Sequence, residues 1–254
     1  MRRYISSGLR FTLLLCLTMQ LTGCVYWRLY QTKVQMEEFN HNFAILVDED
    51  FTLTFKQPLI FSDDVLYLTK LQPTQKKQQN TEQSWKYVFR KVDDQNRVLQ
   101  PEIKFHWGMT FDQNQLMTSW SLSSLFLQIA PAEFLERSIR SLASAEIFTV
   151  SKQVKADLDV VEKVSAVLPK RLDIERHLGE PLSTEQRKDK LVYRYRFLLD
   201  SPDIETGYEE RAISIIKLYF DNESDDLIKM SGRFAGLKIA IDYRKLIANS
   251  GQKS

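Results

Sequence analysis

The sequence is poor in cysteine and glycine, and these two shortages exclude several classes of site. Cys16 and Cys24 are the only two cysteines, so residues 25–254 contain no thiol for a disulfide framework or a cysteine-ligated metal. The eight glycines form no Gly-x-Gly, Walker-type or Gly-x-Ser-x-Gly pattern. The usual glycine-rich phosphate loops and nucleophile elbows are therefore absent from the sequence.

A large excess of charge of one sign is also missing. The chain has 35 Lys and Arg against 33 Asp and Glu, a formal net charge of +2. Three of the arginines, Arg2, Arg3 and Arg10, lie in the first ten residues, and without them the balance is 35 − 3 = 32 against 33. The basic excess belongs to the start of the chain, so no whole-protein field remains to attract nucleic acid or anionic lipid, which leaves only a local basic patch as an alternative.

Long hydrophobic runs are limited to one, over residues 11–21. It is about half of the roughly 20 residues that a membrane-spanning helix needs. It follows a positively charged start, which is the order found in a secretory signal peptide. We therefore expect residues 1–23 to be a cleavable leader.

The end of this leader predicts a lipid anchor. Leu21, Thr22, Gly23 and Cys24 resemble the lipobox that the lipoprotein signal peptidase reads. The resemblance implies a covalent diacylglycerol and an N-acyl lipid on Cys24 and no other cofactor. Buried acyl chains contribute about 0.8 kcal/mol per CH₂, so two or three chains would hold the protein at a membrane. The alternative is an ordinary secreted protein with a cysteine near its cleavage site.

The residue after the cysteine bears on location. In enteric bacteria an Asp at this position tends to retain lipoproteins in the inner membrane, and here the residue is Val25. By this analogy we expect a cell-envelope protein, anchored in the outer membrane and facing the periplasm.

Residues 24–40 form a membrane-proximal segment that is aromatic from its start. Tyr26, Trp27 and Tyr30 suit the headgroup region of a bilayer, and Arg28 and Lys33 suit lipid phosphates. The alternative is a first strand of the folded body, because apolar and polar residues alternate over residues 30–36. Either way the folded body should lie close to the bilayer.

The rest of the chain is rich in predicted strands, with a few helices. Strands are expected in a hairpin over 43–55 and then over 85–92, 103–111, 116–122, 191–199, 212–220, 227–234 and 237–243. Helices are expected over 62–68, 131–143, 159–168 and 170–178, and an exposed polar loop over 72–84. Gly179 and Pro181 should end the last helix.

Two parts of the chain resemble each other. Trp85-Lys86-Tyr87 opens a strand in the first half and Tyr193-Arg194-Tyr195 opens one in the second. Each is followed by an apolar strand ending in Phe-Asp, at Phe111-Asp112 and Phe220-Asp221, and then by a strand that begins with Leu. This order favours a tandem duplication over a chance likeness between alternating strands.

The second unit also resembles a known family. Ile174 to Pro181, Tyr193 to Tyr195, Leu218 to Asp221 and Leu227 are similar to the SmpA/OmlA (BamE-like) outer-membrane lipoproteins over about residues 159–245. The resemblance implies two small helices, the second ending in Leu-Gly-x-Pro, packed on a three-stranded antiparallel sheet. The first unit departs from this pattern because Leu71-Gln72-Pro73 lacks the glycine.

The predicted fold is therefore α+β, with two BamE-like units of small helices packed on antiparallel sheets. We expect a signal peptide over 1–23, a membrane-proximal segment over 24–40, an N-terminal unit over 41–155, a C-terminal unit over 156–246 and a tail over 247–254.

The sequence gives little support for catalysis. His41, His106 and His177 are far apart, and the adjacent carboxylates fall mostly in turns. We expect no enzyme and no metal site. The first hypothesis is a lipoprotein that binds or scaffolds another envelope protein, with Trp107 and Trp120 as candidate contact residues. The alternative is a periplasm-facing, ligand-binding or chaperone-like lipoprotein that carries an apolar cargo.

Overall fold

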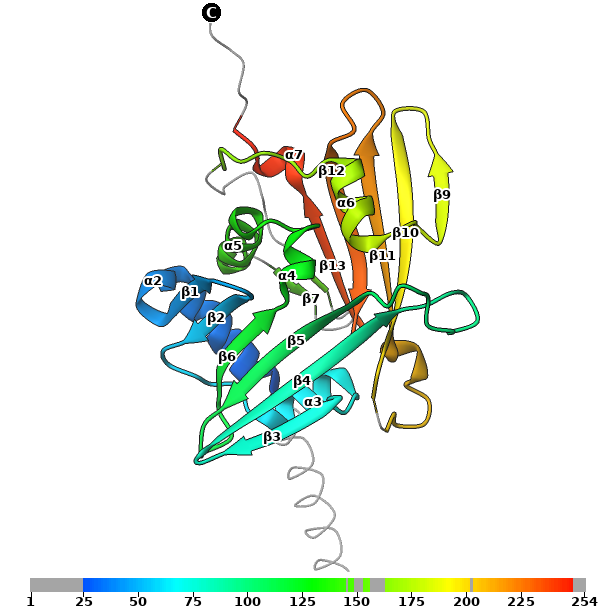
Figure 1. Cartoon of the computed structure of the whole chain (residues 1–254). Coiled ribbons are helices and arrows are strands. Elements are labelled where there is room, and N and C mark those ends of the chain that lie inside the picture. The colour runs from blue at the N-terminus through cyan, green and yellow to red at the C-terminus, as the bar shows by residue number, and fades with distance from the viewer. Residues whose placement is uncertain (1–24, 145, 149–152, 156–162, 202, 249–254) are drawn as a thin grey trace, which may run out of the picture.

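The fold is dominated by one curled antiparallel sheet. The computed structural model describes residues 25–144, 146–148, 153–155, 163–201 and 203–248 (Figure 1). Eleven strands join in a single sheet, and two short strands, β7 (Glu146–Phe148) and β8 (Gln153–Lys155), pair separately. Residues 25–35 form the first described helix.

The remaining elements are as follows. The strands of the large sheet are β1 (Phe43–Val47), β2 (Phe51–Phe55), β3 (Gln75–Gln79), β4 (Glu82–Lys91), β5 (Lys104–Phe111), β6 (Met117–Leu122), β9 (Ser183–Gln186), β10 (Lys190–Leu199), β11 (Ile213–Asp221), β12 (Leu227–Phe234) and β13 (Leu237–Asp242). The helices are η1 (Met36–Glu38), α2 (Phe39–Asn42), α3 (Ser62–Thr69), α4 (Ser124–Leu127), α5 (Ala132–Arg140), η2 (Ser141–Ser144), α6 (Arg171–Leu178), η4 (Glu209–Ala212) and α7 (Tyr243–Leu246).

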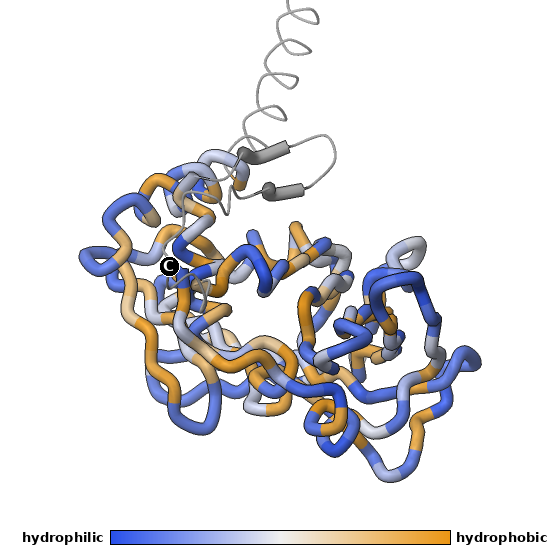
Figure 2. The backbone as a smooth tube through the Cα atoms, turned by 90° about the horizontal axis from the view of Figure 1, so that it is seen from above, coloured by the Kyte–Doolittle hydropathy of each residue, from blue (hydrophilic) through white to orange (hydrophobic). Residues whose placement is uncertain are grey.

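The strand order joins the two halves of the chain. It runs β1-β2-β6-β5-β4-β10-β11-β12-β13, with β3 beside β4 and β9 beside β10. Because β1 and β13 lie at opposite ends of this order, the sheet is open, and seen from above its backbone follows an open curve (Figure 2). The two halves meet where β4 pairs with β10.

The junction between the halves has a local two-fold pattern. Phe89 pairs with Leu199, Arg90 with Leu198 and Lys91 with Phe197. Residues 89, 90 and 91 correspond to 197, 198 and 199 when the chain is shifted by 108 positions, so each half presents the same stretch of strand to the other. The order of a helix, a short strand, a long strand and two further strands also recurs, from α3 to β6 and from α6 to β12.

The core lies on one side of the sheet and is continuous across both halves. Alternating residues of the strands face it, and α3, α4, α5 and α6 bury residues in the same cluster. Phe126 of α4 lies 6.1 Å from Phe105 of β5 and 5.5 Å from Phe234 of β12, measured between ring centroids. One helix therefore packs against strands of both halves on the inner side of the curl (Figure 1).

Two buried tyrosines fix the helix ends in equivalent ways. The Tyr87 hydroxyl donates to the carbonyl of Leu71 at 3.2 Å, and the Tyr195 hydroxyl donates to the carbonyl of Gly179 at 3.1 Å. Both partners of the second bond lie 108 positions after those of the first. The alternating aromatics of each long strand thus hold the chain where α3 or α6 has just ended.

The predicted fold class is wrong. The α+β architecture of two BamE-like units required two small separate sheets, and the structure has one sheet of eleven strands with one core. The physical reason is that residues 89–91 of β4 and residues 197–199 of β10 would lie at unpaired sheet edges in separate units. Pairing them satisfies their backbone groups and removes two exposed edges.

Most of the predicted elements agree with the structure, but not all of them do, and several elements, among them α4 and β9, were not predicted. The expected loop over 72–84 contains β3, a strand whose residues are all exposed, and therefore lacks the apolar alternation of a half-buried strand. Within the predicted helix over 159–168, residues 159–162 lie outside the described residues, and residues 163–168 are not helical. Within this segment, Val164 instead forms an isolated β-bridge with Ile247.

Candidate functional site

The helix over residues 25–35 is docked on the folded body by one face. Val25, Thr32 and the following Met36 are buried, and Leu29 packs against the core. These positions recur at helical spacing, so they form one stripe. The chain therefore enters the core one residue after Cys24, without a polar linker between them.

A buried ion pair locks this helix to α3. Arg28 donates to both carboxylate oxygens of Asp64, with 2.7 Å from Nε to Oδ2, and its guanidinium lies 5.0 Å from the ring centre of Phe61. The side chain of Asp64 is 3% exposed, and it also accepts the backbone N–H of Phe61 at 2.9 Å. Removing the cation would leave a buried carboxylate without its charge partner.

The opposite face of the same helix carries exposed rings. Trp27 is 59% exposed, Tyr30 48% and Val34 43%, at positions i, i+3 and i+7. The rings of Trp27 and Tyr30 stack with 5.8 Å between centroids. The alternative of a first strand over residues 30–36 is therefore wrong, because the buried positions follow a helical period. Arg28, which the sequence suggested for lipid phosphates, donates to Asp64 here, and its contact with phosphate stays a prediction.

A second exposed apolar feature is strand β1, at one end of the large sheet. Leu46 is 64% exposed and Val47 47% exposed. In the described part of the chain, β1 pairs with β2 alone. An apolar strand at an open sheet edge is a template for pairing with another strand.

The hydrogen-bond register shows which backbone groups of β1 face outward. The N–H of Lys56 donates to the carbonyl of Asn42 at 2.9 Å, so this opposite pair is hydrogen-bonded. Since bonded and non-bonded pairs alternate along antiparallel strands, Ala44 and Leu46 bond to β2, and Ile45 and Val47 direct their N–H and C=O groups away from it. The outer edge thus presents the backbone N–H donors and C=O acceptors of Ile45 and Val47.

The turn beside this edge is acidic and is held in place by a histidine. Asp48, Glu49 and Asp50 connect β1 to β2, and Asp48 and Glu49 are exposed. His106 of β5 lies with Nε2 2.8 Å from Oδ2 of Asp50. This contact fixes the turn against the outer face of the sheet.

The two tryptophans predicted as contact residues have different environments. Trp107 is 6% exposed and packs against Phe89 and Phe234 at 5.4 and 5.8 Å between ring centroids, so it is a core residue. Trp120 is partly buried against the core, opposite Leu53 of β2. The exposed aromatic pair is instead Trp27 and Tyr30. The sequence signal for it was the aromatic run after Cys24.

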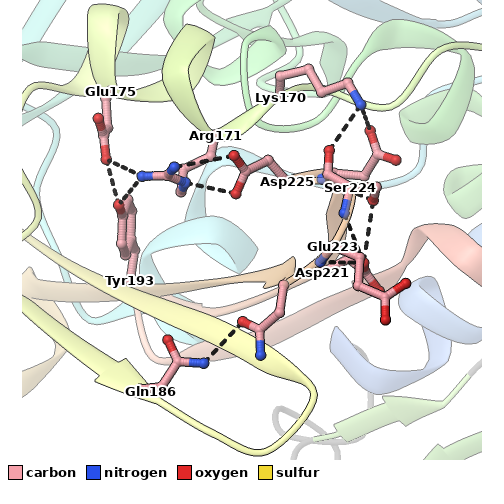
Figure 3. A network of polar contacts seen from close by, with 11 residues as sticks. Lys170, Arg171, Glu175, Gln186, Tyr193, Asp221, Glu223, Ser224 and Asp225 are labelled. Atoms are coloured by element: carbon pink, nitrogen blue, oxygen red, sulfur yellow. Dashed lines mark hydrogen bonds and ion pairs between the residues drawn. The ribbon is translucent and has the colours of Figure 1, made fainter.

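Polar side chains tie the start of α6 to the turn between β11 and β12 (Figure 3). Arg171 donates to both carboxylate oxygens of Asp225 at 2.9 and 3.1 Å and to the Tyr193 hydroxyl at 3.2 Å. Tyr193 donates in turn to Glu175. The bond from Arg171 holds the pKa of Asp225 below its ordinary value, and burial raises the pKa of Tyr193. This network positions α6 against the sheet.

The remaining polar groups are dispersed. His177 lies with Nδ1 2.7 Å from the carbonyl of Asp173, and His41 lies near Gln57, far in the chain from His106. The described residues contain no group of three His, Cys, Asp or Glu side chains that could hold a metal ion.

Two open surface pockets are lined mostly by polar and charged side chains. The first, of about 400 Å³, lies between α3 and the loop before η4 and is lined by Leu66, Tyr67, Lys70, Leu71, Gln72, Asp203 and Glu205. The second, of about 450 Å³, is lined by Met36, Glu37, Glu38, Phe39, Asn40, His41, Arg140 and Ala143.

The predicted lipobox, Leu21, Thr22, Gly23 and Cys24, lies outside the described residues. In the part of the chain that is described, no helix is long and apolar enough to cross a bilayer. Comparison with protein-family models, curated proteins and solved structures finds no match.

Proposed function

We propose that this protein is a non-enzymatic lipoprotein of the cell envelope that binds an extended segment of another envelope protein along the open edge of β1. Lipid on Cys24 would hold it at the outer membrane, on the periplasmic side. The observation that carries the binding proposal is an apolar edge strand whose outward backbone groups, at Ile45 and Val47, have no strand beside them among the described residues.

Strand addition supplies both affinity and selectivity. Backbone hydrogen bonds hold the added strand, and the side chains on either face select its sequence. On the outer face, Ala44 and Leu46 are exposed, so a partner segment should carry apolar residues at every second position. The acidic turn with Asp48 and Glu49 favours a basic residue at the end of the segment that lies beside it.

The short connection to the predicted lipid supports a role at the membrane surface. The first buried residue, Val25, directly follows Cys24. A body that begins at the anchor can present β1 only to partners close to the bilayer. Such a restriction suits a scaffold for other envelope proteins.

The lipid anchor is tested by processing and fractionation. Mass spectrometry of the mature N-terminus should find Cys24 carrying diacylglycerol and an N-acyl chain. Cys24→Ser should move the protein from the membrane fraction to the soluble fraction. Continued membrane attachment of that variant would contradict the anchor.

The binding edge is tested by crosslinking from defined positions. A photo-crosslinking amino acid at position 46 should join the lipidated protein in intact cells to one short segment of another envelope protein. The same group at Leu172 of α6, which is 58% exposed, is the matched control and should not form this adduct. Equal crosslinking from both positions, or an adduct to a second copy of the chain, would contradict the proposal.

A proline substitution tests the strand-pairing geometry itself. Ile45→Pro removes an N–H that points away from β2, so the hairpin keeps its own bonds but loses an outward donor. The adduct from position 46 should disappear in this variant while thermal unfolding stays cooperative.

The apolar-cargo alternative stays a prediction. It requires an enclosed apolar cavity, and the two pockets named above are open and mostly polar. The inner side of the curl is filled by the rings that surround Phe126.

A further inference from the structure

We infer that Trp27, Tyr30 and Val34 form a membrane-facing stripe, which lies against the phospholipid surface and sets the orientation of the body on the bilayer. This inference rests on the proposed lipid anchor at Cys24. It names a second, non-covalent contact with the same membrane.

The stripe is unusual because the helix has apolar residues on both faces. One face, with Val25, Leu29 and Met36, is already used in the core. A helix that has satisfied its buried face normally presents polar side chains to water. Here the outer face presents an indole, a phenol and a valine instead.

The chemistry of these residues matches the edge of a bilayer. Trp and Tyr have an apolar body and a polar tip, and both are enriched where hydrocarbon meets headgroups. Trp27 and Tyr30 are stacked on each other, so the pair forms one surface. A helix lying in the interface plane inserts such a face about 5–10 Å deep.

The position in the chain identifies the occupant. Trp27 is three residues after Cys24, and three residues span at most about 10 Å, so lipid chains on that cysteine would enter the bilayer close to the stripe. The helix cannot turn freely to choose another face, because Arg28 on its inner side is bonded to Asp64. With the lipid inserted, the outer face is the part of the helix that remains for the bilayer.

The stripe is tested with the full, lipidated protein in vesicles of phosphatidylethanolamine and phosphatidylglycerol. Some of the lipids carry bromine on their acyl chains. We expect the brominated lipids to quench tryptophan fluorescence, and we expect this quenching to be lost in Trp27→Phe. Unchanged quenching in that variant would overturn the inference, since Trp27 would then not lie in the bilayer.

A matched control places the same ring elsewhere. In the Trp27→Phe background, Leu172→Trp gives an indole at a position of nearly equal exposure on α6. This ring should not be quenched. Equal quenching at position 172 would mean that the body has no fixed orientation, and would also overturn the inference.

A charge on the stripe should lift it from the lipid without removing the anchor. Val34→Asp, which leaves Trp27 in place, should abolish the quenching, whereas Leu172→Asp should not. Both variants should stay in the membrane fraction. If all variants remain membrane-bound and Val34→Asp has no effect on quenching, the stripe is wrong and the anchor stands. If the unsubstituted chain is soluble and unacylated, the anchor itself is wrong.

Discussion

Lys91 and Arg211 make reciprocal contacts between the two halves of the chain. Lys91 of β4 donates through Nζ to the carbonyls of Leu178 and Glu180 at 2.5 and 2.6 Å, at the end of α6. Arg211 of η4 donates through Nη1 to the carbonyls of Leu68 and Thr69 at 2.8 and 3.2 Å, at the end of α3. Each half thus supplies a cation to the helix end of the other, where free carbonyls favour positive charge.

Replacing Lys91 should destabilise the protein. Lys91 is 4% exposed, and burial lowers the pKa of its ammonium group, an effect that the nearby carboxylate of Glu180 partly offsets. Lys91→Met removes a desolvated charge but leaves two carbonyls without their donor, so we expect a net loss of about 1–2 kcal/mol in the free energy of unfolding. Urea denaturation measures this. Lys217→Met, at an exposed position of β11, is the control, and an equal effect in both variants would contradict the account.

The hydrogen bonds of Tyr87 and Tyr195 should stabilise the folded protein by similar amounts. Tyr87→Phe and Tyr195→Phe each remove one buried hydrogen bond to a carbonyl and leave the ring packing in place. We expect each variant to lose about 0.5–1.5 kcal/mol in the free energy of unfolding. Tyr67→Phe, an exposed tyrosine on α3, is the control. A neutral result for both core variants would mean that the two helix ends are held by other contacts.

The buried tyrosines predict a loss of stability at alkaline pH. Burial raises the pKa of Tyr87, Tyr195 and Tyr243 above the ordinary value of about 10. Because the pKa of each tyrosine is raised in the folded state, the stability that its neutral, buried phenol contributes is complete below about pH 10. This stability is lost as the pH rises toward the folded pKa. Each tyrosine should steepen the fall in the free energy of unfolding by about 1.4 kcal/mol per pH unit in that window.

Denaturant melts between pH 9 and 12, a window about one unit below to two above the ordinary pKa, measure this slope. In Tyr243→Phe, the slope of the free energy of unfolding against pH should decrease by about 1.4 kcal/mol per pH unit, which is the contribution of one proton. An unchanged slope in that variant would contradict the prediction. Absorbance at alkaline pH should also show that these phenols ionise only when the protein unfolds.

The ion pair under the first helix should control the order of residues 25–35. The side chains of Arg28 and Asp64 are 24% and 3% exposed. Arg28→Met leaves the buried carboxylate without its cation, and we expect a loss of about 1.5–3 kcal/mol in the free energy of unfolding. Amide hydrogen exchange over residues 25–35 should become faster.

A matched control is Arg176→Met. Arg176 pairs with Asp173 on the surface of α6, where the two side chains are 71% and 53% exposed. The expected effect there is below about 1 kcal/mol, because exposed pairs contribute little. Comparable losses of unfolding free energy in Arg28→Met and Arg176→Met would show that the burial of Asp64 does not depend on Arg28.

The single core predicts that the halves do not fold apart. Fragments covering 24–155 and 156–254 each lose the pairing between β4 and β10 and half of the ring cluster around Phe126. We expect neither fragment to unfold cooperatively when heated, and we expect the intact chain to unfold in one transition. A cooperative transition in an isolated fragment would support independent units after all.

The sequence alone determined much of the local structure. Alternating rings from Trp85 to Phe89 and from Tyr193 to Phe197 require strands with one buried face, whatever that face packs against. Gly179, with φ of 64°, and Pro181 end α6 as the sequence indicates. The aromatic run after Cys24 is also visible in the sequence, because it depends on neighbours in the chain, and the leader and the lipobox stay predictions.

Only the tertiary structure decided which strands and helices meet. A strand with one apolar face fits a small separate sheet and a large shared sheet equally well. Neither segment of sequence therefore indicates that Phe89 pairs with Leu199. Residues 30–36 alternate as a strand would, whereas the structure forms a helix over 25–35 whose buried face packs on the body and whose Arg28 bonds Asp64, 36 positions away. Long-range packing therefore chose between alternatives that local periodicity does not distinguish.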